Sequence, residues 1–194
     1  MRAALPTATL LPLSLVALAA GCGNERQHAP RITGIQEPQR ATRLAYPGQG
    51  ISFAAPRNWY QSTGKQPLVS VVASGDATVA VWRYRRKEPI PKAGTELQGA
   101  QANLSDSLRS RGGSVQVQST RTLDVNGVKG IQVVANERIG GQARRVRSTH
   151  LFDRAAEIVI DAYAPPAAFS RVDTSVFQPL LRSVRLRAPS SSQA

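Results

Sequence analysis

Alternating apolar and polar residues mark several short β-strands in the region that follows residue 46. A period of two is typical of strands that bury one face and expose the other. Three such runs come first along the chain, at residues 51–54, 68–73 and 78–84. In the third run, Val79 and Val81 share one face, and Trp82 and Tyr84 share the other. The pattern predicts a strand there but leaves open which face points toward the core.

A longer period predicts the strongest helix of the chain over residues 95–111. Four apolar residues recur three and four positions apart on one stripe: Leu97, Ala100, Leu104 and Leu108. Thr95 and Gln98 match a capping box, and the glycines at 112–113 would end the helix. We expect this helix to cover a sheet with Leu104 in the core, so that Leu104→Asp would unfold the domain by burying a charge.

Alternation returns between residues 114 and 163, where tight turns separate the runs. Asn126 and Gly127 give a strong hairpin signal, and the glycines at 140–141 mark the next reversal of the chain. Two further strands are predicted at residues 143–152 and 157–163. Consecutive short strands joined by tight turns predict an antiparallel meander.

The C-terminal region predicts a broken helical segment over residues 167–183. Because Pro179 fits only the first turn of a helix, we expect a second helix to begin near Ser175. Residues 184–186 are predicted to form a closing strand.

Residues 10–22 form an apolar run that follows Arg2 and ends in small side chains. This layout is typical of a secretory signal peptide, and the run is shorter than the roughly 20 apolar residues of a spanning helix. The sequence around residues 19–22 (AAGC) resembles the lipobox of bacterial lipoproteins. The resemblance implies cleavage between Gly21 and Cys22 and a lipid on the Cys22 sulfur. An ordinary signal peptide with an incidental cysteine and an uncleaved membrane anchor are the alternatives.

Four segments follow from these patterns. Residues 1–21 are predicted as a lipoprotein signal peptide, 22–45 as the lipidated cysteine and a flexible tether, 46–188 as the folded domain and 189–194 as a disordered tail. Residues 23–45 show no sustained period and contain Pro30 and Pro38. A flexible tether of that length would reach roughly 25–30 Å.

The chain is strongly basic, with 25 Lys and Arg residues against 12 Asp and Glu and a formal charge of +13. This excess reflects either genomic composition or attraction to anionic head groups, worth roughly 1 kcal/mol per nearby cation. The candidate contacts with an anionic surface are Arg83, Arg85, Arg86, Lys87, Arg145 and Arg147. A solvated rim is the alternative for this cluster. Nucleic acid is not an expected partner, because only 5% of the residues are aromatic and no recognised binding signature occurs.

Candidate catalytic chemistry is sparse. The only histidines are His28 and His150, and no G-x-S-x-G motif occurs. A dyad of His150 with Asp161 or Asp153 is possible, but no companion nucleophile is marked by the sequence. Cys22 is the only cysteine, so no disulfide is expected, and no histidine pair has metal-ligand spacing. We therefore expect no catalytic residues, no metal and no cofactor.

Two motifs carry a resemblance to a known superfamily. The pattern from Gly50 to Trp59 (GISFxxPxxW) resembles the first strand and turn of the Mog1/PsbP-like superfamily, and the pattern from Phe177 to Leu186 resembles its last helix and strand. Together with the lipobox, the whole is similar to actinobacterial LpqN-type lipoproteins. The resemblance implies an α+β fold, an α/β/α sandwich with an antiparallel sheet flanked by helices, that serves as a non-catalytic binding or adaptor module.

The resulting expectation is a lipid-anchored lipoprotein on the outer face of the bacterial cell membrane. It would bind an envelope protein or polymer and would not be an enzyme. A carrier of a lipid or small apolar ligand is one alternative, and an envelope hydrolase that uses His150 is another.

Overall fold

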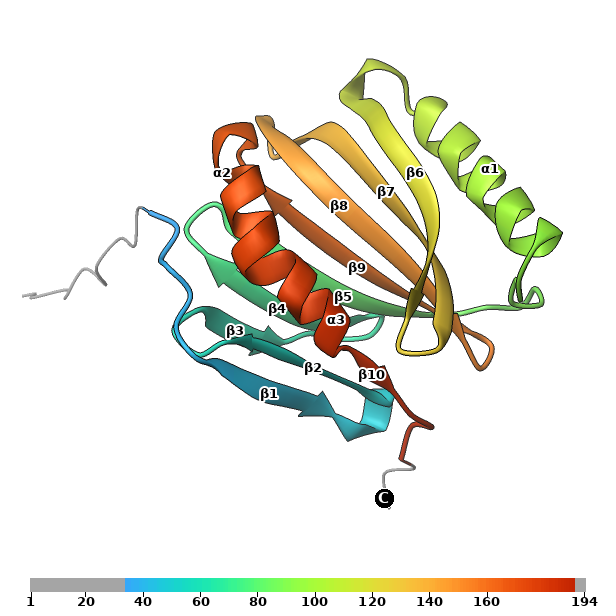
Figure 1. The fold of residues 1–194 in the computed structure, drawn as a ribbon, viewed down its shortest axis with the longest axis horizontal. Coiled ribbons are helices and arrows are strands. Elements are labelled where there is room, and N and C mark those ends of the chain that lie inside the picture. Colours follow the sequence, from blue (N-terminus) through green and yellow to red (C-terminus); the bar gives the residue numbers. More distant parts are fainter. Residues whose placement is uncertain (1–33, 191–194) are drawn as a thin grey trace, which may run out of the picture. The chain divides into compact units, whose positions relative to one another are not determined.

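One seven-stranded antiparallel sheet organises the fold (Figure 1). The computed structural model describes residues 34–190. Across the sheet the strand order is β3-β4-β5-β9-β8-β7-β6. The strands are β3 (Tyr60–Thr63), β4 (Leu68–Ser74), β5 (Ala77–Arg85), β6 (Val115–Val125), β7 (Val128–Ile139), β8 (Gln142–Asp153) and β9 (Ala156–Ala164). The predicted strands 68–73 and 78–84 and the antiparallel meander are confirmed.

A second antiparallel sheet has three strands in the order β1-β2-β10. These strands are β1 (Ala41–Tyr46), β2 (Ile51–Pro56) and β10 (Arg185–Leu186), and the 3₁₀ turn η1 (Pro47–Gln49) joins the first two. The central strand β2 pairs with both neighbours, so the end of the domain closes onto its beginning. The predicted closing strand is confirmed.

Residues 34–46 belong to the fold, which corrects the prediction that a flexible tether extends to residue 45. Strand β1 pairs with β2 along its whole length. Upstream of it, the Gln36 backbone N–H donates to Ser74 Oγ at 2.9 Å, and the Trp59 indole N–H donates to the Gln36 carbonyl at 3.3 Å. The sequence pattern did not predict this strand, because only Leu44 and Tyr46 in β1 are half-buried and its other residues are exposed.

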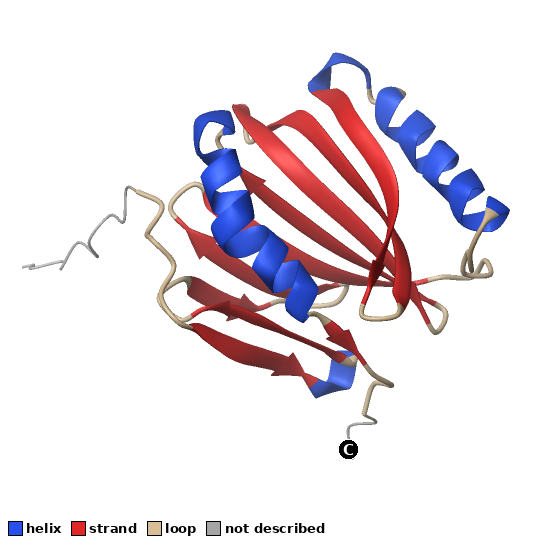
Figure 2. Cartoon of the chain, in the orientation of Figure 1, coloured by secondary structure: helices blue, strands red, loops and turns tan. Residues whose placement is uncertain are grey.

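Different helices cover the two faces of the seven-stranded sheet (Figure 2). On one face, which we call the α3 face, lie α2 (Pro166–Val172), the π-helical turn η3 (Asp173–Phe177) and α3 (Gln178–Ser183). On the other, the α1 face, helix α1 (Thr95–Arg109) lies over β6 and β7 and is followed by the 3₁₀ turn η2 (Gly112–Ser114). Helices therefore flank an antiparallel sheet in an α+β fold, as predicted.

The main core lies on the α3 face, between the seven-stranded sheet, the C-terminal helices and the small sheet. Its most deeply buried side chains include Phe53, Val72, Val79, Val81, Leu151, Ile158 and Phe177. A smaller cluster lies beneath α1, where Leu97 and Leu108 pack on Ile131, Val133 and Ala135. This arrangement shows which face of β5 points toward the core. Val79 and Val81 point into the main core, whereas Tyr84 on the other face is 41% exposed.

Helix α1 follows the prediction in extent but not in its details. Gly94 occupies the N-cap position with φ of +60°, and no side chain caps the helix, so the predicted capping box of Thr95 and Gln98 does not form. Leu97 and Leu108 are buried, but Leu104 is only half-buried. Helix α1 lies over β6 and β7 at one edge of the sheet, and Leu104 on its apolar stripe packs only partly against the cluster beneath it. Leu104 is therefore not the core residue that the stripe predicted.

The predicted break in the C-terminal helical segment is wrong, because α2, η3 and α3 run on without interruption. The Gln178 backbone N–H donates to the Asp173 carbonyl, five residues earlier, which widens one turn of the helix. Proline lacks a donor and its ring clashes with the carbonyl four residues before it. The widened turn immediately before Pro179 accommodates that ring without ending the helix.

Two further observations complete the fold. Asn126 and Gly127 have φ of 54° and 86°, which confirms the predicted hairpin with a left-handed two-residue turn.

Within residues 34–190, none of the helices has both the length and the apolarity required to cross a membrane.

The main core provides the first prediction. Phe177 is 2% exposed, and we expect Phe177→Ala to lower the free energy of unfolding by about 3–5 kcal/mol, through lost burial and a residual cavity. Urea denaturation monitored by circular dichroism measures this loss. Tyr60→Ala is the matched control, because Tyr60 is 67% exposed and its loss should change stability by less than about 0.5 kcal/mol. Equal losses in both variants would contradict the assignment of the core.

Candidate functional site

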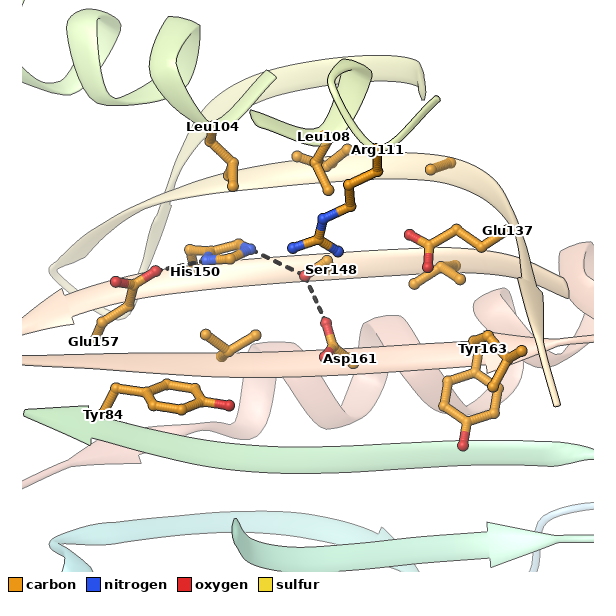
Figure 3. A pocket seen from close by; sticks show the side chains of 15 residues that line it. Tyr84, Leu104, Leu108, Arg111, Glu137, Ser148, His150, Glu157, Asp161 and Tyr163 are labelled. Carbon is orange, nitrogen blue, oxygen red and sulfur yellow. Dashed lines mark hydrogen bonds and ion pairs between the residues drawn. The ribbon is translucent and has the colours of Figure 1, made fainter. Parts of the chain in front are cut away.

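A groove of about 340 Å³ lies on the α1 face, beside the part of the sheet that α1 covers (Figure 3). Helix α1 contacts β6 and β7, so the same face of β8, β9 and β5 is left outside its cover. Leu104 and Leu108 of α1 form one wall of the groove, and Val133, Val146 and Val159 add apolar side chains from the strands of its floor. Polar side chains line the same floor, among them Glu137, Ser148, His150, Glu157 and Asp161.

Four of the polar side chains form a continuous hydrogen-bonded chain (Figure 3). Glu157 Oε1 lies 2.7 Å from His150 Nδ1, and His150 Nε2 lies 3.1 Å from Ser148 Oγ. The Ser148 hydroxyl donates in turn to Asp161 Oδ1 at 2.5 Å. Two adjacent strands, β8 and β9, supply every member of this chain.

The pairing of β8 with β9 explains why these side chains meet. Ser148 lies directly opposite Asp161, and His150 follows two residues later on the same face of β8. Glu157 lies opposite Phe152, so it is the diagonal neighbour of His150 and within reach of its ring. Alternation along two strands in a fixed register is enough to place all four side chains on one face.

The proton positions follow from the hydrogen-bonding capacity of each group. A serine hydroxyl has one proton, and in this arrangement Ser148 donates it in a hydrogen bond to Asp161. The roles of the His150 nitrogens in the contacts with Ser148 Oγ and Glu157 Oε1 depend on which nitrogen carries a proton. When Nδ1 carries the only proton, Nε2 is an acceptor and competes with Asp161 for the Ser148 proton.

Glu157 is held by two partners. The hydrogen bond from His150 and the nearby Arg86 guanidinium lower the pKa of Glu157 below its ordinary value, although burial opposes this shift. Arg86 Nη1 lies 2.8 Å from Glu157 Oε2, and the same guanidinium lies over the Phe152 ring at 5.4 Å. Both carboxylate oxygens therefore have fixed partners, which orients Glu157 toward His150.

The other end of the groove contains Glu137 and Arg111. Burial raises the pKa of Glu137, the charge of Asp161 adds to this effect, and Arg111 opposes it. The Arg111 guanidinium points into the groove over β8 (Figure 3). Burial and the charges of Asp161 and Glu157 also raise the pKa of Tyr84, which lines the groove from β5. The groove thus combines negative and positive side chains beneath an apolar wall.

In the part of the chain that the structure describes, no group of three or more His, Cys, Asp or Glu side chains could hold a metal ion. The chemistry available in the groove is that of hydroxyl, imidazole, carboxylate and guanidinium groups.

The six predicted anionic-surface residues are found in different environments. Arg147 is nearly buried, with 14% side-chain exposure, and donates from Nε and Nη2 to the Asp173 carboxylate at 2.6 Å. Arg145 is half-buried, with its guanidinium 6.0 Å from the Phe169 ring centre, and Arg86 pairs with Glu157. Arg83 is half-buried, and Arg85 and Lys87 are exposed. Gly21, Cys22 and His28 lie outside the described residues.

The predicted partners of His150 are corrected by the structure. Asp161 bonds to Ser148, and Asp153 pairs with Arg154 at 2.5 Å, whereas Glu157 bonds to the His150 ring. Sequence reasoning missed Ser148, and it treated Glu157 as a carboxylate paired with arginine and not as a partner of His150. The position of Ser148 two residues before His150 in a predicted strand was a usable signal for the first. The position of Glu157 depended on the turn between β8 and β9, whose length the sequence did not define.

Comparison with known proteins identifies the fold. No family model and no curated protein sequence matches this chain. The solved structures similar to it include cyanobacterial PsbP from Synechocystis, with 14% identity and a TM-score of 0.57 over 76% of this chain and 92% of that one. They also include LpqN of Mycobacterium tuberculosis, described as involved in cell envelope biogenesis, with 12% identity and a TM-score of 0.56 over 76% and 90%.

A protein of unknown function from Pseudomonas aeruginosa is similar at 10% identity, with a TM-score of 0.50 over 78% of this chain and all of that one. The fold is therefore the Mog1/PsbP-like fold, and the predicted resemblance is confirmed at that level. None of these three proteins is described by its name as having a catalytic activity.

The lowered pKa of Glu157 gives a prediction of pH dependence. A carboxyl group whose pKa is lower in the folded than in the unfolded state stabilises the fold at pH values above its ordinary pKa, which is 4.5 for Glu157. This stabilisation is lost as the pH falls through the lowered pKa. We therefore expect wild-type protein to lose more stability than Glu157→Gln when the pH falls from near 7 to near 4. Urea denaturation at the two pH values measures the difference.

Asp106→Asn serves as the control for this experiment, because the Asp106 side chain is 74% exposed. It should keep the wild-type dependence of stability on pH. A Glu157→Gln variant with the same acid dependence as wild type would contradict the role of the His150 and Arg86 contacts.

Proposed function

We propose that this protein is a lipid-anchored binding module of the bacterial cell envelope, and that the groove on the α1 face is its ligand-binding site. The observation that supports the proposal best is the groove itself, where apolar side chains surround a few polar side chains of fixed geometry. Ligand sites in proteins commonly combine mostly apolar walls with a few well-placed polar groups. Binding and adaptor functions need no further chemistry from these residues.

The envelope location is supported by two independent features. The sequence of residues 19–22 resembles a lipobox, which would attach the mature chain to the outer face of the cell membrane through Cys22. The Mog1/PsbP-like fold is shared with LpqN, which is described as involved in cell envelope biogenesis. At 12% identity the likeness concerns the fold, so the envelope role is part of the proposal.

The surface next to the groove suits a protein or polymer partner. Trp82 and Tyr84 lie on the α1 face of β5, with ring centroids 6.3 Å apart and planes inclined by 15°. Tyr84 is 41% exposed, and Tyr60 on the edge strand β3 is 67% exposed. Exposed aromatic side chains with a polar tip contribute contact area at low cost in conformational entropy. We place the partner across these rings and the groove.

The anchor is tested by changing its cysteine. We expect Cys22→Ser to abolish labelling by an alkyne analogue of palmitate and to move the protein from the membrane fraction to the soluble fraction. Immunoblotting of fractionated cells expressing either chain measures both effects. A Cys22→Ser protein that stays in the membrane fraction as fully as wild type would contradict lipid anchoring.

The groove is tested with two tryptophan substitutions on the same helix. Leu104 lines the groove and is half-buried, so Leu104→Trp should fill the groove without burying a charge. Ala102 is exposed, so Ala102→Trp adds the same side chain outside the groove. We expect chemical crosslinking in intact cells to give a partner adduct with wild type and Ala102→Trp and at least a tenfold weaker one with Leu104→Trp. Equal adducts with both variants would remove the groove from the binding surface.

A further inference from the structure

The chain of side chains in the groove contains a nucleophile, a base and a carboxylate in line. Ser148 Oγ is 3.1 Å from His150 Nε2, and His150 Nδ1 is 2.7 Å from Glu157 Oε1. A hydroxyl beside an imidazole whose other nitrogen is held by a carboxylate is the arrangement that activates a serine nucleophile. We propose that the groove also hydrolyses carboxylic esters, with Ser148 as nucleophile and His150 as general base. The proposal rests on the proposed function in one respect, since the substrate must enter the same groove.

Glu157 acts as a positioning residue. When the ring carries a single proton, Glu157 accepts it from Nδ1, so the Nε2 lone pair is directed at Ser148. Its other oxygen is held by Arg86 at 2.8 Å, and both side chains of that ion pair are less than a quarter exposed. The ring of His150 is therefore fixed in orientation before a substrate arrives.

Asp161 controls which way the nucleophile points. Its Oδ1 accepts the Ser148 proton at 2.5 Å, and this contact competes with donation to His150. When Nε2 is unprotonated, rotation of the hydroxyl about the Cβ–Oγ bond turns the Ser148 proton away from Asp161 and toward Nε2. The resting groove thus holds Ser148 in an inactive orientation that a small rotation converts to the active one.

Arg111 supplies a cation where negative charge would develop. Its guanidinium points into the groove over β8 (Figure 3) and takes part in no ion pair among residues 34–190. Attack on an ester carbonyl produces an oxyanion, and a donor aimed at that oxygen lowers the barrier. The backbone groups of β8 are engaged in strand pairing on both sides, so a side chain has to provide this contact.

The apolar side chains that line the groove define the substrate class. Leu104, Leu108, Val146 and Val159 line the groove beside the Ser148 hydroxyl, and a volume of about 340 Å³ accommodates a small acyl group. The substrate is therefore an ester with a short aliphatic acyl chain, whose carbonyl carbon meets Ser148 Oγ while the chain packs beneath α1.

The reaction balances without any additional reactant except water. Ser148 Oγ forms a bond to the carbonyl carbon while His150 Nε2 takes the hydroxyl proton, and the carbonyl electron pair moves onto oxygen. Collapse breaks the ester C–O bond, and His150 returns the proton to the leaving alkoxide, which departs as an alcohol. Water then attacks the acyl-serine with the same proton transfers and releases the carboxylic acid and free Ser148.

The test uses the full-length protein purified in detergent, with p-nitrophenyl butyrate as substrate and a fluorophosphonate as covalent probe. We expect wild type to release p-nitrophenol and mass spectrometry to find the phosphonyl adduct on Ser148. Ser148→Ala and His150→Ala should lower kcat at least about 10²-fold. Glu157→Gln should lower kcat with little change in KM, and Asp161→Asn should raise kcat because an amide accepts the Ser148 proton more weakly.

Ser119→Ala is the matched control, because Ser119 is exposed on β6 and does not line the groove, and it should keep wild-type kcat. Absence of a Ser148 adduct, or equal turnover by wild type and Ser148→Ala, would overturn the proposal. Probe labelling uses the wild-type chain, so it does not depend on the folding of any variant. If hydrolysis fails while Leu104→Trp still loses the crosslinked partner and Ala102→Trp keeps it, the binding function stands without the catalytic one.

Discussion

The register between β8 and β9 is the constraint on which the rest of the molecule depends. Their pairing runs from Arg145 opposite Ala164 to Asp153 opposite Ala156, in the centre of the seven-stranded sheet. A shift of one residue would exchange every side chain of β8 between the two faces. The turn between the strands places Arg154 and Ala155 at φ of 45° and 55°, a left-handed conformation that costs roughly 1 kcal/mol or more for each such residue. The strand pairing therefore holds the turn in place, and not the reverse.

Alternate residues of β8 contact the C-terminal helical segment on one face of the sheet and line the groove on the other. Arg147 points to the α3 face, where its guanidinium pairs with Asp173 in the π-helical turn and also donates to the buried Gln132. With side-chain exposures of 14% and 8%, Arg147 and Asp173 form a largely buried pair, and loss of one partner of such a pair typically costs about 3–5 kcal/mol. The next residue, Ser148, points to the groove. The strand that fixes the C-terminal helix to the sheet thus also fixes the polar floor of the groove.

Features encoded by local patterns could be predicted from the sequence. The Asn126–Gly127 hairpin, the extent of α1 and the antiparallel meander from β6 to β9 follow from turn chemistry and apolar periodicity, and all are confirmed. Features that depend on distant residues could not be predicted. Strand β1 carries little apolar alternation and exists because β2 offers it a partner, and Leu104 is half-buried because it lines the groove beside α1. The His150 partner was missed because residues 154–155 include no glycine or asparagine, so the turn and the resulting Glu157 position were not marked.

The most direct measurement of this central constraint is the set of cross-strand nuclear Overhauser effects between β8 and β9 in solution. The register predicts cross-peaks that connect Ser148 with Asp161 and His150 with Val159. Cross-peaks displaced by one residue, with Ser148 opposite Ile160, would place His150 and Glu157 on opposite faces and contradict both the groove and its chemistry.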